Sequence, residues 1–248
     1  MGQHFLIDSS YIEKIIDWLA LQSQDKVIEI GPGQGVLTTE LLSTGAQVGA
    51  IEVDDDLVEY LRKKFSKSPN FSLHHMDALK FDYQAVSGDK IRVVGNLPYQ
   101  ISSPILFVLL SQMQHVQDMC FMLQHEFVER MVAKVGTKQY GRLSVMIQYA
   151  CNVQKLFVVP ATAFDPPPRV MSAVAYLTPK KSLPLTAGEY QLFSKLVATA
   201  FQQRRKMCRK VLQPFISADR LLELGIDPSV RPEQLSTDDY IRISQLIY

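Results

Sequence analysis

Val27-Ile28-Glu29-Ile30-Gly31-Pro32-Gly33-Gln34-Gly35 is the most informative segment of the sequence. It begins as a short β-branched run and ends in a turn with glycine at every second position, so a buried strand gives way to a tight bend. Four further strand-like runs follow downstream: Gln47 to Val53, Phe71 to His74, Ile91 to Gly95 and Met119 to Gln124. They alternate with helix-compatible stretches such as 37–42 and 56–65. The alternation predicts an α/β fold in which helices cover a parallel sheet.

The end of the chain has a different pattern. Two strand candidates, Cys151 to Val159 and Ser172 to Leu177, lack an obvious helix between them, which predicts a hairpin at the sheet edge. Residues 178–188 contain two prolines and a glycine and are typical of a linker. Beyond it, apolar spacing predicts a helix from Leu192 through Met207, ended by Pro214, and a last helix capped at Ser236. We therefore expect domains at 1–180 and 181–248, the second small and wholly helical.

Composition limits the class of protein. The 248 residues are 47% hydrophobic and 21% charged, as in an ordinary globular protein, and no apolar stretch is long enough to cross a membrane. No signal peptide precedes Gly2, and no long hydrophobic seam argues for a dimer, so we expect a cytoplasmic monomer without membrane contact. The three cysteines are far apart and the five histidines lack metal-ligand spacing, so we expect reduced thiols and no metal.

The glycine turn predicts a nucleotide-type ligand. Its G-x-G-x-G spacing differs from the G-x-G-x-x-G that seats a dinucleotide pyrophosphate. Glu52 ends the next strand, where its carboxylate can accept both hydroxyls of a ribose, and Asp77 follows the strand after that, where it can receive an adenine amine. A nicotinamide cofactor and an adenosyl-methionine donor both satisfy this pattern, and a tight structural turn or a helix cap at Asp77 also would.

A second motif, Asn96-Leu97-Pro98-Tyr99, follows the strand candidate 91–95. The lone pair of a ring-conjugated amine such as adenine N6 is delocalised, and a side-chain amide oxygen followed by a backbone carbonyl can localise it by accepting both N–H groups. Tyr99 can stack on the base, and Phe164, before the stiff segment Asp165-Pro166-Pro167-Pro168-Arg169, can cover its other face. The alternative interpretations are a Pro-containing turn and ordinary core packing.

Positive charge is shifted toward the C-terminal part. Residues 181–248 hold 10 Lys and Arg against 7 Asp and Glu, whereas the rest of the chain holds 16 against 18. Five cations lie within 204–210, and Arg204, Arg205 and Lys206 are candidate contacts to RNA phosphate, the alternative being a solvated helix face. Lys63, Lys64 and Lys67 are interpreted as solvated.

The chain closely resembles the bacterial 16S rRNA adenine-N6,N6-dimethyltransferases, the KsgA/RsmA family, over nearly its whole length. The matching segments are 2–6 (GQHFL), 29–38, 95–107 (GNLPYQISSPILF), 121–128, 140–145 (YGRLSV), 164–174, 200–206 and 231–236 (RPEQLS). The resemblance implies a Rossmann-like class I methyltransferase sheet with a small all-α C-terminal domain. It further implies S-adenosylmethionine as donor and, as the substrate, two adjacent adenosines near the 3′ end of 16S rRNA in the small ribosomal subunit precursor.

The resemblance also assigns residues. It implies that the donor is bound by the segment Gln3 to Leu6, including His4 and Leu6, and by the turn and strand-end residues Gly31, Gly33, Glu52, Asp77 and Asn96. It implies that Asn96, the Leu97 carbonyl and Tyr99 hold the target adenine.

Three departures from the family pattern stand out. The family usually has Asn at the position of His4 and Asp at the position of Met171. The basic leader that often precedes Gly-Gln is absent, which predicts weaker RNA binding than in a relative that has one and is compatible with a trimmed chain.

Two alternatives remain. Large-subunit rRNA adenine dimethyltransferases tend to have Ile in place of Leu97 and lack the 231–236 segment. A non-catalytic RNA-binding assembly factor on a methyltransferase scaffold would not need the Gly31 turn, Glu52, Asp77 and Asn96, all of which are present.

Overall fold

The computed structural model describes residues 4–86, 90–98 and 100–248, and its contacts form two compact units. The first unit comprises residues 1–128 and 154–179, and the second comprises 129–153 and 180–248. One division falls at the expected linker. Residues 129–153, which the sequence analysis placed in the first domain, belong instead to the second unit.

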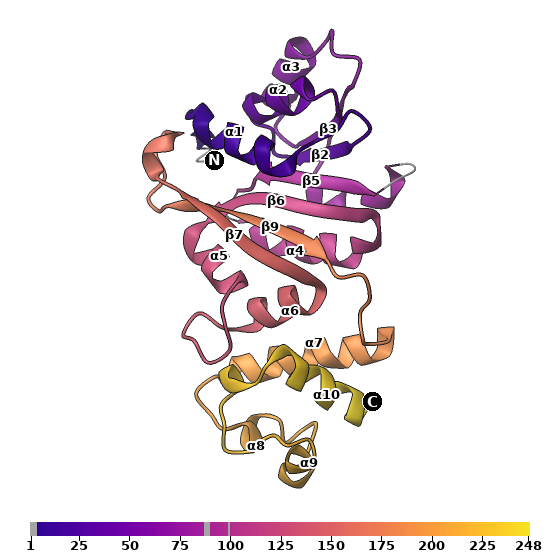
Figure 1. Cartoon of the computed structure of the whole chain (residues 1–248), viewed down its shortest axis with the longest axis vertical. Coiled ribbons are helices and arrows are strands. Elements are labelled where there is room, and N and C mark those ends of the chain that lie inside the picture. The colour runs from indigo at the N-terminus through magenta and orange to yellow at the C-terminus, as the bar shows by residue number, and fades with distance from the viewer. Residues whose placement is uncertain (1–3, 87–89, 99) are drawn as a thin grey trace. The chain divides into compact units, whose positions relative to one another are not determined.

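A seven-stranded sheet organises the chain (Figure 1). Its strand order is β4 (Phe71–His75), β3 (Gln47–Glu52), β2 (Lys26–Ile30), β5 (Ile91–Asn96), β6 (Val116–Gln124), β9 (Ser172–Pro179) and β7 (Cys151–Val159). Strands β4, β3, β2, β5 and β6 are parallel, and β9 is antiparallel to β6. The five predicted parallel strands are confirmed, and the two late strand candidates lie at the edge.

The strand order reverses between β2 and β5. From β2 the chain proceeds outward through β3 and β4, and it then returns to β5 on the other side of β2, where Glu29 pairs with Val94. Open α/β sheets bind ligands at such a switch point, beyond the carboxyl ends of the strands. The glycine turn after β2 and Asn96 at the end of β5 flank this point.

Helices α1 (Ser9–Leu19) and α2 (Val36–Ser43) pack on one face of the sheet. Their side chains Ile15, Leu19 and Leu41 join Val94 and Met122 in one apolar cluster. Helices α3 (Asp55–Lys64) and α4 (Ser102–Ser111) follow β3 and β5 in the chain. Short 3₁₀ helices occupy Ala78–Lys80 (η1), Tyr83–Ala85 (η2), Met113–His115 (η3), Ala161–Ala163 (η4) and Pro232–Gln234 (η5).

A small second sheet pairs the beginning of the chain with a distant segment. Strand β1 (Phe5–Leu6) runs antiparallel to β8 (Phe164–Asp165), and Leu6 lies opposite Phe164. These strands were not predicted from the sequence, because two residues are too few to show a period. The pairing brings two predicted site segments, His4 to Leu6 and Phe164, side by side.

The second unit is mainly helical. It contains α6 (Arg142–Ala150), α7 (Ala187–Gln202), α8 (Cys208–Val211), α9 (Ala218–Glu223) and α10 (Thr237–Ile247), and α5 (His125–Met131) lies across the division. The Tyr149 ring of α6 stacks on Tyr190 of α7, with centroids 5.4 Å apart. The predicted cap of the last helix is confirmed, since Ser236 Oγ accepts the Asp239 N–H at 3.0 Å.

The predicted helix from Leu192 past Met207 is wrong. Helix α7 ends at Gln202, and a turn leads into α8. The Cys208 N–H donates to the Val230 carbonyl at 2.7 Å, and the Arg209 N–H donates to the Pro228 carbonyl at 3.0 Å. These bonds to a distant loop replace the i to i−4 bonds that would have continued the helix.

The three cysteines are buried free thiols. Burial raises the pKa of Cys120, Cys151 and Cys208 to about 12 in each case. Within the described ranges no three His, Cys, Asp or Glu side chains converge on a point where they could hold a metal. No described helix combines the length and the apolar character needed to span a membrane.

Candidate active site at the carboxyl ends of the strands

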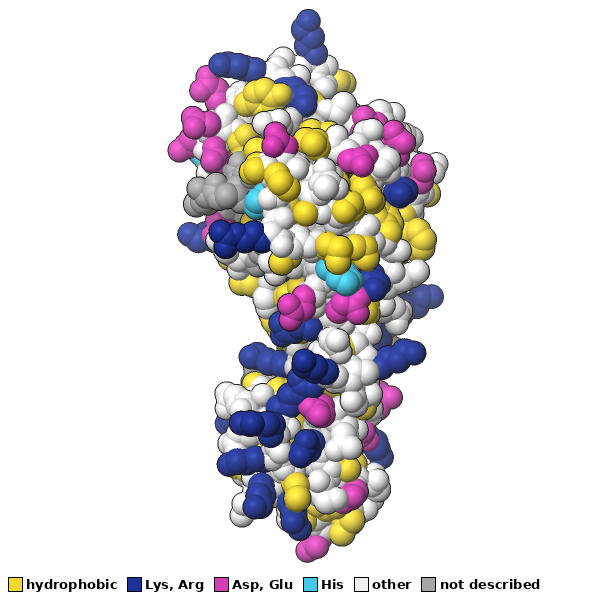
Figure 2. Space-filling view, turned by 90° about the vertical axis from the view of Figure 1, so that its left-hand side faces the viewer, with side chains coloured by type: hydrophobic (Ala, Val, Ile, Leu, Met, Phe, Trp, Pro, Cys, Tyr) yellow, Lys and Arg dark blue, Asp and Glu magenta, His cyan; other side chains and the backbone are white. Residues whose placement is uncertain are grey.

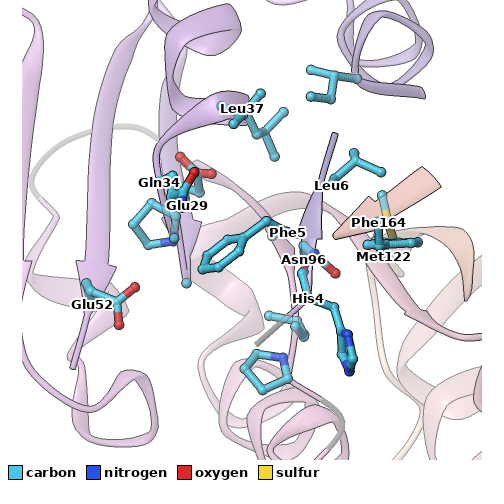
Figure 3. A pocket seen from close by; sticks show the side chains of 18 of the residues that line it. His4, Phe5, Leu6, Glu29, Gln34, Leu37, Glu52, Asn96, Met122 and Phe164 are labelled. Atoms are coloured by element: carbon cyan, nitrogen blue, oxygen red, sulfur yellow. Dashed lines mark hydrogen bonds between the residues drawn. The ribbon is translucent and has the colours of Figure 1, made fainter. Parts of the chain in front are cut away.

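A cavity of about 260 Å³ opens beyond β2, β3 and β5. Residues from the chain start, the glycine turn and the strand ends line it, among them His4, Phe5, Leu6, Gly31, Gly33, Gln34, Glu29, Glu52, Asn96, Leu97, Met122 and Phe164. In Figure 3, Glu52 lies on one side and Asn96 and His4 lie on the other. The structure therefore brings most of the predicted donor and acceptor residues to one cavity.

The glycine turn has a backbone that other residues rarely adopt. The φ angles of Gly31, Gly33 and Gly35 are +67°, +56° and +72°. A Cβ on Gly33 would lie 3.1 Å from the Phe5 ring, and a Cβ on Gly35 would lie 2.7 Å from the Phe65 ring. The turn therefore needs glycine both for its conformation and for the close approach of neighbouring groups.

Glu52 ends β3 with a buried carboxylate. Its Oε1 accepts the backbone N–H groups of Val53 at 2.8 Å and Asp54 at 3.1 Å. No described residue donates a hydrogen bond to Oε2. Because a carboxylate offers about four acceptor positions, two remain for the hydroxyls of a ligand.

Glu29 is a site residue to which the sequence analysis gave no role. It is 1% exposed and lines the cavity, and Thr38 Oγ1 donates to its Oε2 at 2.5 Å. Burial is the main cause that raises the pKa of Glu29 to about 7; the nearby Glu52 carboxylate adds to the rise, and the Thr38 hydroxyl and the Lys64 ammonium oppose it. The available signal was a carboxylate inside an apolar strand directly before a glycine turn.

The amide of Asn96 is oriented by the chain start. Its Nδ2 donates to the His4 carbonyl at 3.4 Å, so Oδ1 is the atom left to accept from a ligand. The His4 ring is fixed in turn, because its Nδ1 donates to the Pro166 carbonyl at 2.6 Å. Among bonds of described residues outside helices and strands, none uses the Leu97 carbonyl, whereas the Leu97 N–H donates to the Met122 carbonyl at 3.1 Å.

Other predicted residues lie differently. Asp77 caps η1, accepting the Leu79 N–H at 2.9 Å, and is not among the residues that line the cavity. Phe164 is 4% exposed and belongs both to the cavity wall and to the apolar core. Gln3 and Tyr99 lie outside the described residues.

The basic segment, residues 204–210, belongs to the second unit. Figure 2 shows many Lys and Arg side chains on one face of this unit. Arg204 forms an ion pair with Glu233 and donates to the Thr137 carbonyl at 3.2 Å. Arg205 and Lys206 are exposed. Of the three predicted RNA contacts, Arg204 is therefore engaged within the protein.

Comparisons with known proteins agree with this geometry. The family model described as ribosomal RNA adenine dimethylase matches residues 1–248. The chain is 45% identical over 248 residues to the ribosomal RNA small subunit methyltransferase A of Pseudomonas syringae pv. tomato, covering 99% of this chain and 92% of that protein. It is 46% identical over 247 residues to the protein of that name from Marinobacter nauticus, covering 99% and 90%.

Solved structures share the whole fold. A dimethyladenosine transferase from Plasmodium falciparum superposes with a TM-score of 0.85 at 28% identity, covering 97% of this chain and 96% of that one. The 23S rRNA methyltransferase ErmE superposes with a TM-score of 0.79 at 24% identity, covering 98% and 99%, and this second match shows the fold alone. The fold is the Rossmann-like methyltransferase fold with a small helical C-terminal domain, and the chain belongs to the ribosomal RNA adenine dimethylase family.

Proposed function

We propose that this chain uses S-adenosylmethionine to dimethylate N6 of two adjacent adenosines near the 3′ end of 16S rRNA, within the small ribosomal subunit precursor. The proposal is supported by 45–46% identity to proteins named for small-subunit rRNA methylation. The structural observation that carries it is the placement of Asn96, with its Oδ1 available, beside the glycine turn at the switch point. We further propose that the protein acts as a cytoplasmic monomer.

The cavity fits the proposed donor. S-adenosylmethionine, when bound, supplies a methyl group on a positively charged sulfur that a nitrogen nucleophile displaces in line. Glu52 would accept the ribose hydroxyls through its two remaining acceptor positions. Gly31 and Gly33 would let the backbone approach the ligand closely, with His4 and Leu6 closing the cavity from the β1 side.

Two carboxylates also suit a cationic ligand. Glu29 and Glu52 both line the cavity, and the Glu52 carboxylate raises the pKa of Glu29. A ligand with positive charge compensates them. Asp77 caps η1 and accepts from Leu79 through one oxygen, so acceptor positions remain on its carboxylate for the adenine amine that the resemblance assigns to it.

We assign the acceptor side to Asn96 and Leu97. Asn96 Oδ1 and the Leu97 carbonyl would accept the two N–H bonds of adenine N6, which localises the nitrogen lone pair and aims it at the donor methyl. A strong base is not needed, because the amine becomes acidic as it takes the methyl group and can lose its proton to water. Phe164 and Tyr99 would hold the extruded base by stacking.

We assign RNA contact to the helical C-terminal domain, residues 181–248. Arg205 and Lys206 are exposed and would contact phosphate, whereas Arg204 would hold the turn in place through Glu233 and Thr137. Phosphate contacts of this kind position an RNA without reading its sequence. The choice of adenosines would then come from the cavity and the shape of the RNA.

A methylation assay tests the proposal. Small-subunit precursors from cells lacking this protein are incubated with it and labelled donor, and the modified nucleosides are mapped on 16S rRNA. Two adjacent dimethylated adenosines are expected. Label on large-subunit rRNA would favour the alternative substrate, and binding without label would favour a non-catalytic assembly factor.

A further inference from the structure

Lys64 reaches from the end of α3 to the glycine turn. Its Nζ donates to the Gln34 carbonyl at 2.8 Å and to the Gly35 carbonyl at 3.3 Å. Lys64 is exposed, as expected of a solvated cation, but its ammonium is also hydrogen-bonded to the glycine turn. Lys63, one residue earlier, points elsewhere and pairs with Glu59 at 2.6 Å.

The same end of α3 packs directly against the turn. The Phe65 ring and the Leu61 side chain lie within 3.0 Å of the position that a Gly35 Cβ would take. The Lys64 ammonium lies 5.3 Å from the centre of the Phe65 ring, a cation–π distance. The ammonium is thus held against the turn by two carbonyls and an aromatic ring.

The two bonds fix peptide planes at the cavity wall. The C=O and N–H groups of a trans peptide point in opposite directions, so a carbonyl held from the α3 side fixes the orientation of its whole peptide unit. The units concerned join Gln34 to Gly35 and Gly35 to Val36, and both Gln34 and Val36 line the cavity. The Gly35 N–H also donates to the Pro32 carbonyl at 2.8 Å, and the Gly35 carbonyl also accepts from the Thr39 N–H at 3.2 Å and from Thr39 Oγ1 at 2.8 Å. The Lys64 ammonium adds to these bonds a donor for the Gln34 carbonyl.

The Lys64 charge also acts on the cavity. Its positive charge lowers the pKa of Glu29, against the larger effect of burial and the repulsion from Glu52. Thr38 donates a hydrogen bond to Glu29 but carries no charge. The charged groups that influence the pKa of Glu29 are Glu52 and Lys64. Lys64 is therefore linked both to the shape and to the charge of the donor cavity.

We propose that Lys64 is a positioning residue for the donor: it holds the Gln34 and Gly35 peptide planes and balances the Glu29 carboxylate from outside the cavity. The inference rests on the proposed function of the cavity as the S-adenosylmethionine site. It concerns a residue that need not touch the donor.

The test compares Lys64→Met with Lys63→Met, a matched loss of one lysine from the same helix. S-adenosylmethionine is titrated into each full-length protein by calorimetry. Lys64→Met should raise the donor Kd about 5-fold, the effect of one solvent-exposed hydrogen bond, with the melting temperature and RNA affinity unchanged. Lys63→Met should match the wild type, and Lys64→Arg should restore most of the affinity.

The pH dependence separates positioning from general packing. Donor affinity should change with pH as Glu29 ionises, and the midpoint should move to higher pH in Lys64→Met but not in Lys63→Met. An unchanged donor Kd and midpoint in Lys64→Met, or an equal loss in Lys63→Met, would overturn the inference while leaving the proposed function intact. A wild-type protein that does not bind S-adenosylmethionine would overturn both.

Discussion

Replacing Glu29 with glutamine should change how the stability of the first unit depends on pH. The pKa of Glu29 is raised from 4.5 to about 7 by burial, so the folded protein keeps a proton there that the unfolded chain has lost. The contribution of Glu29 to the free energy of unfolding is therefore greatest below pH 4.5 and falls as the pH rises to about 7. A difference of about 2.5 in pKa corresponds to a loss of about 3 kcal/mol.

The glutamine side chain of Glu29→Gln would have nearly the same shape and could still accept from Thr38, but it would carry no charge. The free energy of unfolding of Glu29→Gln relative to wild type should therefore rise by roughly 2–3 kcal/mol between pH 5 and pH 8, because part of the loss has already occurred by pH 5. Urea unfolding can be followed by Trp18, the single tryptophan, which lies in α1 of the first unit. The exposed Glu40→Gln serves as control. Parallel pH curves for wild type and Glu29→Gln would show that the pKa of Glu29 is not raised by folding.

Four further variants test the assigned roles. Glu52→Ala should weaken donor binding by roughly 1–3 kcal/mol while RNA affinity persists, and an unchanged calorimetric donor Kd would contradict the ribose assignment. Asn96→Ala should lower turnover at least ~10²-fold and alter the ratio of monomethyl to dimethyl adenosine measured by nucleoside mass spectrometry, with the melting temperature unchanged; wild-type turnover would remove Asn96 from the mechanism. Replacing Arg205 and Lys206 together by Gln should flatten the salt dependence of RNA affinity, whereas Arg204→Gln should instead lower the melting temperature of the second unit. Equal salt slopes in wild type and the double variant would return both cations to the solvated surface.

The sheet was predictable because its strands carry strong periodic signals. The β-branched runs before Gly31, at 47–53 and at 91–95 lie where the structure has β2, β3 and β5. Parallel connection then places their carboxyl ends at one edge, which brings the Gly31 turn, Glu52 and Asn96 to one cavity. Local pattern and topology together were sufficient for this part of the site.

The missed features depend on contacts between distant segments. Strand β1 forms only by pairing with β8, about 160 residues later, and α7 stops at Gln202 where the backbone turns to bond residues 228–230. Lys63 and Lys64 are neighbouring residues of the same type, and they differ only in the direction in which each side chain leaves the helix. Strand pairing, helix ends and side-chain directions of this kind depend on tertiary packing, which overrides local propensity.

The burial of all three thiols makes the protein suited to site-specific labelling. With a pKa of about 12, each native cysteine is a thiolate in roughly 1 molecule in 10⁵ at pH 7, and reagents that attack thiolates find it shielded. A cysteine introduced on the exposed surface would therefore react selectively without removal of Cys120, Cys151 or Cys208. A pair of dyes, one on each unit, could then report by energy transfer how the distance between them responds when donor and RNA bind.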